Sequence, residues 1–272
     1  MDNVLHNTGN ERRMSDSLFE NQKIDRDPFR VNFDDARYPN RVKVIMGKKA
    51  PEHLDMVGNI KLLDMAGIGL CGSRHATDKS LEIARDCAEQ AAQNDVSVIS
   101  GNAAGVDFKA HFSCLEVGGK TILVIPEGMN HFRIRKDLKP VWDWGRVLVI
   151  SQFNPGEPWR GYRAMKRNQL LLALSRVMIV VEAGEKSGSL NTGEEAIKHG
   201  IPLYVAQHQD MSADLQGNQI LLQKKRTRKL SKSISSNRAN LTEVFKNLEE
   251  DRTLKNSFSH QKKFKLHPAL SK

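Results

Sequence analysis

The run Ile68-Gly-Leu-Cys-Gly-Ser-Arg74 decides the fold, because a short apolar segment in it ends in a turn of small residues. A helical pattern follows over 78–93, where Ile83 and Cys87 stand about one turn apart. Asp78 occupies the expected N-cap of that helix. The run therefore predicts a buried strand, a turn and a helix, which together are the repeating unit of an α/β protein.

The same alternation continues along the chain as far as Ala206. Continuous apolar runs are typical of strands buried on both faces of a parallel sheet, and further runs follow at 96–99, 121–125, 147–150, 177–181 and 202–205. Helices are expected between them at 104–117, 163–175 and 190–199. Because strands and helices alternate, we expect an α/β fold with a doubly wound, mainly parallel sheet.

Composition divides the chain into three expected parts. Residues 1–37 form a polar N-terminal extension, residues 38–222 the folded domain, and residues 223–272 a basic C-terminal tail with a possible helix at 240–250. The tail holds fourteen basic and four acidic residues and carries the whole formal net charge of +10, since residues 1–222 hold twenty-eight of each. Its pattern leaves open a nucleic-acid-binding arm, a solubilising end or a partner-docking segment.

Several protein classes do not fit the sequence. The longest apolar runs, such as 177–181, are far shorter than the roughly 20 residues of a membrane span. The N-terminus lacks a basic segment followed by an apolar one, so we expect no secretory signal. Cys71, Cys87 and Cys114 form no Cys-x-x-Cys pair, which argues against a disulfide framework or a zinc site. We expect a cytoplasmic protein that is not embedded in a membrane.

Candidate ligand contacts begin at the first turn. Ligands of doubly wound sheets bind beyond the carboxyl ends of the strands, and Gly72, Ser73 and Arg74 follow the first apolar run. These residues suit a phosphate, because small residues expose backbone N–H groups and an arginine adds a two-pronged donor. The simpler alternative is a tight turn with a solvated arginine.

A second turn of the same kind is Ser100-Gly-Asn102, with another glycine at 105. The glycines permit close approach of the backbone to a ligand, and Ser100 adds a hydroxyl donor. Asp107 and His111 lie four residues apart on the helix that follows. They fit either an acid–base pair or a hydrogen bond that orients the helix, and we favour the hydrogen bond.

A basic stretch lies inside the folded domain at 129–176, where ten basic residues accompany three acidic ones. Lys166-Arg-Asn168 opens an apolar helix within it. Aromatic residues are interleaved with the cations: Phe132, Trp142, Trp144, Phe153, Trp159 and Tyr162. Cations that contact phosphates and rings that stack on bases would give this pattern. The alternative is a solvated basic face over core aromatics, and for each tryptophan we favour the core.

Two glycine-rich segments fail to match the known nucleotide-binding motifs, which argues against a nucleotide cofactor. The spacing from Gly67 to Gly72 matches a dinucleotide fingerprint, but two of its glycines fall inside the expected strand and no suitable acidic residue follows a second strand. Lys186-Ser-Gly-Ser189 follows a buried strand, but its glycine and lysine spacing is not that of a Walker A loop. We expect no cofactor, no metal and no catalytic residue.

Taken in order, these motifs resemble those of the DNA-processing protein A (DprA/Smf) family. The resemblance covers about residues 38 to 222 and rests on an ordered set: Tyr38-Pro39, Gly58-Asn59 with Leu62-Leu63, Gly72-Ser73-Arg74, Ser100 to Asp107 with His111, Arg167-Asn168, Glu182-Ala183 with Ser187 to Thr192, and Gly217-Asn-Gln-Ile220. The set is far more specific than any one member. Asn102 and Gln169 depart from the family pattern, which has an apolar residue and a second arginine there.

The resemblance implies a Rossmann-like domain of the SLOG superfamily that binds single-stranded DNA in a basic pocket through its phosphates, without reading sequence. It further implies a homodimer that assists a RecA-type recombinase in recombination, DNA uptake or defence, and no enzymatic activity. Carried over to this sequence, the DNA- and phosphate-binding residues are Gly72, Ser73, Arg74, Ser100, Gly101, Asn102, Lys166, Arg167, Asn168, Lys186, Ser187, Gly188 and Ser189.

A second hypothesis is a nucleotide-binding sensor or a phosphoribohydrolase-like enzyme of the same superfamily. The segment Gly188-Ser-Leu-Asn-Thr-Gly-Glu-Glu195 partly resembles the phosphoribohydrolase motif. Under that hypothesis, Glu194 or Glu195 assists N-glycosidic cleavage and Arg74 holds the 5′-phosphate. A third hypothesis, a pure interaction module, predicts no ligand at all.

Overall fold

A computed structural model describes residues 27–208, 215–233 and 236–249 of the chain. Its centre is one nine-stranded sheet with the strand order β1-β2-β6-β5-β4-β3-β7-β8-β9. Both β1–β2 and β2–β6 pair antiparallel, and every other pair in the sheet is parallel. The strands are β1 (Phe29–Asn32), β2 (His53–Gly58), β3 (Gly67–Cys71), β4 (Ser97–Ser100), β5 (Thr121–Ile125), β6 (Val147–Ser151), β7 (Val177–Val180), β8 (Leu203–Ala206) and β9 (Thr227–Leu230).

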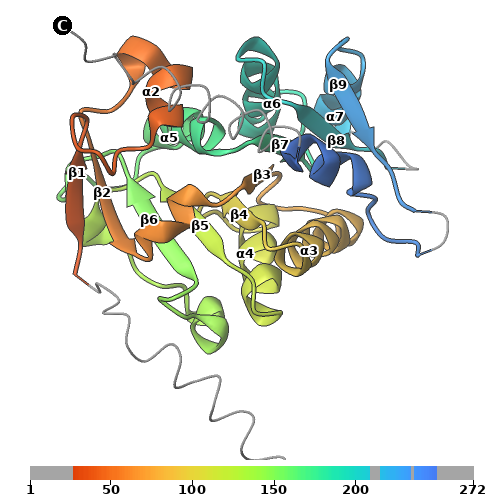
Figure 1. Ribbon diagram of the computed structural model, residues 1–272. Helices are drawn as coiled ribbons and strands as arrows, with labels where there is room; N and C mark the ends of the chain where they lie inside the picture. The colour runs from red at the N-terminus through yellow and green to blue at the C-terminus, as the bar shows by residue number, and fades with distance from the viewer. Residues whose placement is uncertain (1–26, 209–214, 234–235, 250–272) are drawn as a thin grey trace, which may run out of the picture.

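Helices cover both faces of this sheet (Figure 1). One face carries α2 (Asn40–Met46), α5 (Gly161–Leu174), α6 (Gly188–Lys198) and α7 (Gln216–Leu222), and the other carries α3 (Asp78–Gln93) and α4 (Val106–Glu116). Short 3-10 turns complete the chain: η1 (Gly47–Lys49), η2 (Ile60–Asp64), η3 (Met129–His131) and η4 (Lys136–Val141). The α/β class and the doubly wound, mainly parallel sheet predicted from the sequence are confirmed.

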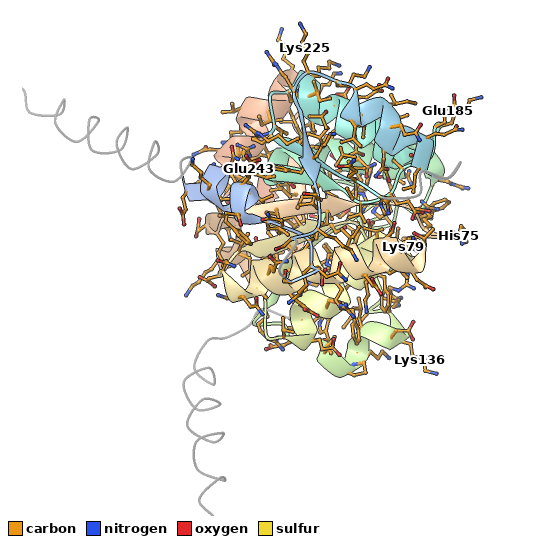
Figure 2. All side chains as sticks on the ribbon, turned by 90° about the vertical axis from the view of Figure 1, so that its right-hand side faces the viewer. His75, Lys79, Lys136, Glu185, Lys225 and Glu243 are labelled. Atoms are coloured by element: carbon orange, nitrogen blue, oxygen red, sulfur yellow. The ribbon has the colours of Figure 1, made fainter. Side chains whose placement is uncertain are left out.

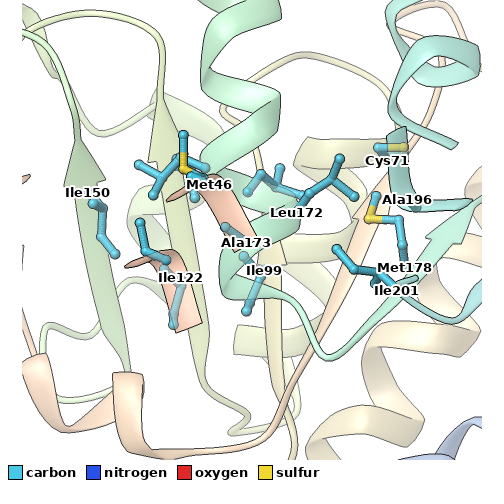
Figure 3. Packing of buried hydrophobic residues seen from close by; sticks show 14 of the residues in the cluster. Met46, Cys71, Ile99, Ile122, Ile150, Leu172, Ala173, Met178, Ala196 and Ile201 are labelled. Carbon is cyan, nitrogen blue, oxygen red and sulfur yellow. The ribbon is translucent and has the colours of Figure 1, made fainter. Parts of the chain in front are cut away.

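Apolar side chains from the sheet and the first set of helices pack into one large cluster. Figure 3 shows Ile99, Ile122 and Ile150 from the strands beside Leu172 of α5 and Met46 of α2. Each of these residues is almost completely shielded from solvent. Removing so much apolar surface from water is the main force that holds the helices on the sheet.

The order of the strands places the ligand crevice. From β3 the chain moves outward through β4, β5 and β6, and it later returns to the other side of β3 with β7, β8 and β9. Strand order therefore reverses between β3 and β7, and ligands of doubly wound sheets bind at such a switch point, beyond the carboxyl ends of the strands. The turns that begin at Gly72 and at Glu182 meet at this point.

The start of α3 differs in one detail from the sequence prediction. Its N-cap is Thr77, whose Oγ1 accepts a hydrogen bond from the backbone N–H of Ser80 at 3.3 Å, and Asp78 is the first helical residue. Asp78 still lies in the first turn, where a carboxylate favours the positive end of the helix dipole. Both threonine and aspartate suit this helix start, so composition alone does not distinguish the two positions.

The folded unit extends beyond the expected boundaries of 38 and 222. Strand β1 belongs to the expected N-terminal extension, while β9 and a helical segment at 242–249 belong to the expected tail. Val31 is the one buried residue of β1, and Leu230 is the one buried residue of β9. Short edge strands with a single buried side chain carry almost no apolar pattern, which is why the sequence did not reveal them.

The tail docks on α3 through apolar contacts and ion pairs. Leu241, Val244 and Leu248 join the cluster that includes the inner face of α3. The guanidinium of Arg238 contacts two carboxylates of α3, with Nε 2.9 Å from Asp86 Oδ1 and Nη2 2.5 Å from Glu89 Oε2. The part of the tail at 236–249 is therefore packed against the domain, and the charge of Arg238 is neutralised there.

Arg238→Ala should lower the free energy of unfolding by about 2 kcal/mol, because it removes the nearer of the two cations around the Asp86 carboxylate, which is 4% exposed. Urea denaturation measures this loss. Lys229→Ala on the exposed part of β9 is the control and should change stability by less than about 0.5 kcal/mol. Equal effects of the two substitutions would show that the Arg238 ion pairs do not hold the tail.

Candidate functional site

A pocket of about 420 Å³ opens at the switch point between β3 and β7. Its walls come from the turn after β3, the start of α4, one face of α5 from Gly161 to Leu171 and the loop that leads into α6. The lining residues are Cys71, Gly72, Ser73, Arg74, Ala103, Asp107, Gly161, Ala164, Met165, Arg167, Asn168, Leu171, Gly184, Ser187, Gly188 and Ser189. Four segments far apart in the sequence thus build one cavity with both polar and apolar walls.

Eight of the thirteen predicted site residues line this pocket, and five do not. Those in the lining are Gly72, Ser73, Arg74, Arg167, Asn168, Ser187, Gly188 and Ser189. Ser100 is fully buried and its hydroxyl donates to the carbonyl oxygen of Leu70 at 2.6 Å, so it braces the sheet. Gly101 lies beneath the pocket, while Lys166 and Lys186 are exposed next to lining residues and Asn102 is half-buried.

The first two turns are held together by backbone contacts. Gly105 has a positive φ of 71°, and a β-carbon there would lie 2.8 Å from the carbonyl carbon of Arg74. The N–H of Val106 donates to the carbonyl oxygen of Ser73 at 3.2 Å. A glycine is therefore required at 105, both for its backbone conformation and for the close approach that fixes the Ser73–Arg74 turn.

The N-terminus of α6 forms a second wall. Ser187 caps this helix, since its Oγ accepts from the N–H of Leu190 at 3.1 Å. The side chain of Asn168 donates to Thr192 Oγ1 at 3.0 Å and so ties α5 to α6. The first N–H groups of a helix have no partners within it and attract anions, and Gly188 and Ser189 place these groups at the pocket.

Asn218 fixes the loop between β7 and α6 from below. Its Oδ1 accepts from the N–H of Ala183 at 2.7 Å, and its Nδ2 donates to the carbonyl oxygens of Val181 and Ala206 at 3.0 and 2.9 Å. The predicted site did not include this residue. Its signal in the sequence was the Gly217-Asn218 pair, since Gly217 lets the backbone of Ala183 pass close by.

A buried pair of opposite charges forms the floor. Arg167 and Asp107 are 5% and 6% exposed. Burial lowers the pKa of the Arg167 guanidinium, and the negative charges of Asp107 and Glu127 partly offset this shift. Burial also raises the pKa of the Asp107 carboxyl, and the positive charge of Arg167 partly offsets that shift. Arg167 also donates to the carbonyl oxygen of Val124. Any β-carbon at Gly101 would overlap both side chains, so this glycine makes room for the pair.

His111 does not bond to Asp107, so that prediction is wrong. Its Nε2 lies 2.6 Å from the carbonyl oxygen of Gly101, and its Nδ1 lies 2.6 Å from the hydroxyl of Thr121 on β5. The carboxylate of Asp107 instead accepts from the N–H of Ala103 at 3.4 Å. His111 thus supports the turn after β4 from inside the core, and Asp107 serves the pocket.

The mouth of the pocket carries exposed apolar side chains. Trp159, Tyr162 and Met165 are 51%, 65% and 42% exposed, and the guanidinium of Arg74 lies 5.7 Å from the centre of the Trp159 ring. Trp159 is therefore not a core residue, contrary to the expectation for each tryptophan. It stands in the loop before α5, where no strand or helix turns it inward.

The remaining aromatic residues of the basic stretch pack inside. Phe153 is 5% exposed, and Phe132, Trp142 and Trp144 pack against the cluster formed by β5, β6 and α4. The rings of Trp142 and Trp144 meet edge to face with 5.1 Å between their centres. Only part of the predicted stacking surface is thus available to a ligand.

The described residues contain neither a group of three or more His, Cys, Asp or Glu side chains placed for a metal ion nor a helix long and apolar enough to cross a membrane. Asp107 is the one acidic side chain in the lining of the pocket. Glu195 lies elsewhere on α6 and pairs with Lys198 at 3.1 Å, and Glu194 lies 3.8 Å from Lys224. The pocket therefore offers many donors and little acid.

Stability should fall in acid because of His111. Burial lowers the pKa of His111 to about 4 from its ordinary 6.5. The neutral imidazole of the folded state therefore makes its full contribution to stability above pH 6.5, and this contribution is lost as the pH falls toward 4. The loss amounts to about 3 kcal/mol. Urea denaturation between pH 7.5 and 4.5 should show a shallower pH dependence for His111→Gln than for the wild type. The same slope in both proteins would contradict this assignment.

Comparison with known proteins identifies similar chains. The family model described as DNA recombination-mediator protein A matches residues 30–241. The chain is 35% identical over 153 residues to DNA processing protein DprA of Streptococcus pneumoniae, covering 56% of this chain and 54% of that protein. It is 30% identical over 173 residues to Protein Smf of Borreliella burgdorferi, covering 62% and 54%. The matched stretch thus spans about half the length of these relatives.

Two solved structures share the fold. DNA processing protein A from Streptococcus pneumoniae matches with a TM-score of 0.66 and 28% identity over 80% of this chain and 74% of that chain. DNA processing protein A from Helicobacter pylori, whose structure is described as giving insights into a unique single-stranded DNA binding mode, matches with a TM-score of 0.64 and 27% identity. That match covers 74% of this chain and 90% of that chain.

Proposed function

We propose that this chain, which belongs to the DNA recombination-mediator protein A family, binds single-stranded DNA without reading its sequence. One observation carries the proposal: Arg74 lies at the mouth of a donor-rich pocket with its guanidinium beside the exposed ring of Trp159. A guanidinium holds a phosphate, and an exposed ring stacks on a base. The pair offers both contacts within one nucleotide of each other.

The arrangement favours a single strand over a duplex. Bases in a duplex are stacked on one another and turn their faces away from protein side chains, whereas bases of a single strand are free to stack on aromatic rings. Trp159 and Tyr162 are more than half exposed beside the pocket. The N-terminus of α6 and the Ser73–Arg74 turn would hold phosphates of any sequence, since they contact only the backbone.

We further propose that the pocket binds its ligand and does not cleave it. The phosphoribohydrolase hypothesis needs Glu194 or Glu195 at the ligand, but both lie outside the pocket and pair with basic residues. Asp107 is packed with Arg167 under Gly101. Assistance to a RecA-type recombinase, by a homodimer in the cytoplasm, is the role that the resemblance implies, and it stays a prediction.

Arg74→Ala and Trp159→Ala should each weaken the binding of labelled poly-dT by roughly tenfold or more, because they remove a phosphate contact and a stacking contact. Trp159→Phe should retain most of the affinity, since a ring remains. The matched control is Arg228→Ala, which removes an arginine that also lies over an aromatic ring, Tyr204, at 5.6 Å, but outside the pocket.

Fluorescence anisotropy with poly-dT and duplex DNA of equal length measures these effects. Duplex binding as tight as single-strand binding, together with unchanged affinity in Arg74→Ala, would refute the proposal. Incubation with nucleoside monophosphates tests the hydrolase hypothesis separately, and release of free base from any of them would favour that hypothesis.

A further inference from the structure

A basic lobe connects β5 to β6. Consecutive parallel strands are usually joined by a helix, but residues 126–146 make this connection with only the 3-10 turns η3 and η4. Four cations lie close together in this lobe, Arg133, Arg135, Lys136 and Lys139, with the single carboxylate of Asp137 among them. The segment from 133 to 139 thus has a net charge of +3.

The lobe is held in place by Leu138 and by two of its arginines. Leu138 is 1% exposed and anchors η4. The Nη1 of Arg133 donates to the carbonyl oxygens of Asn130 and Phe132 at 2.9 and 2.7 Å. The guanidinium of Arg135 lies 5.1 Å from the centre of the Phe108 ring on α4. These contacts fix the backbone of the lobe and the positions of Arg133 and Arg135, while Lys136 and Lys139 stay exposed to solvent.

The cations of the lobe lack carboxylate partners. Among the described residues no ion pair involves Arg133, Arg135, Lys136 or Lys139. Some other surface cations are neutralised: Lys120, for example, lies 2.6 Å from Asp95. The lobe therefore presents an uncompensated positive field, which attracts polyanions.

The position of the lobe relates it to the pocket. Figure 2 shows Lys136 on the same side of the molecule as His75 and Glu185, which follow the carboxyl ends of β3 and β7. Phe108, under the guanidinium of Arg135, is the residue next to Asp107 of the pocket lining. The lobe thus contacts α4 within about one helical turn of the pocket.

We propose that residues 133–139 are a second phosphate-contacting surface, which holds the single strand after it leaves the pocket over the start of α4. The inference rests on the proposed function, because its occupant is the same strand. Lys136 and Lys139 contact phosphates there, and the site contacts no bases. A short strand of about six nucleotides occupies the pocket alone, while a strand of about thirty engages both surfaces.

The test compares Lys136→Gln/Lys139→Gln with a control that removes equal charge from two exposed lysines, Lys225→Gln/Lys229→Gln. Figure 2 shows Lys225 on a different side of the molecule from Lys136. Loss of two phosphate contacts should weaken the binding of dT30 by roughly 25-fold at 0.1 M salt and flatten the slope of log K against log salt by about 1.4. Binding of dT6 should stay unchanged, and the control should bind dT30 as the wild type does.

The outcomes separate the two proposals. Unchanged dT30 affinity and slope in Lys136→Gln/Lys139→Gln, an equal loss for dT6, or an equal loss in the control would each overturn the second surface. Arg74→Ala must weaken both dT6 and dT30 if the pocket binds the strand. Failure of Arg74→Ala to weaken either one would instead overturn the proposed function. All four charged side chains are exposed, so circular dichroism should show that the variants remain folded.

Discussion

The buried guanidinium of Arg167 is the constraint on which the site depends. Its side chain contacts the carboxyl ends of three strands. It donates a hydrogen bond to Val124 near the end of β5 and packs with Asp107 against Gly101, which follows β4. It also lines the pocket beside the turn after β3. A buried charge is tolerated only with partners around it. The partners of Arg167 therefore dictate where α5 lies, and α5 in turn carries one wall of the pocket.

Because the negative charge of Asp107 compensates the positive charge of Arg167, the floor contributes little to the positive charge of the pocket. Attraction for an anion comes instead from the rim, where Arg74 is exposed, and from the N-terminus of α6. Asn168 links these parts, since its Oδ1 accepts from Arg167 and its Nδ2 donates to Thr192 on α6. The buried pair fixes the shape of the pocket, and the groups at its rim bind the anion.

Sequence patterns predicted the central strands and helices because buried parallel strands and amphipathic helices leave long apolar signals, as in β5 and α3. They did not predict β1 or β9, in which a single residue is buried. Glycine and serine turns located the pocket, yet Ser100 is fully buried outside the lining and Arg167 lines the pocket as a buried residue paired with Asp107. Residue type shows that a donor is present, whereas only packing decides whether it points to a ligand, as the exposure of Trp159 also illustrates.

The central claim is that the switch-point pocket holds a single strand, and hydrogen–deuterium exchange with oligo-dT tests it most directly. Bound strand should slow exchange at residues 72–74, 184 and 187–189, which line the pocket, and at 159–168 on its rim. Residues 224–232 should exchange as they do in the free protein. Protection confined to 224–232, or no protection at the pocket while DNA is bound, would contradict the claim.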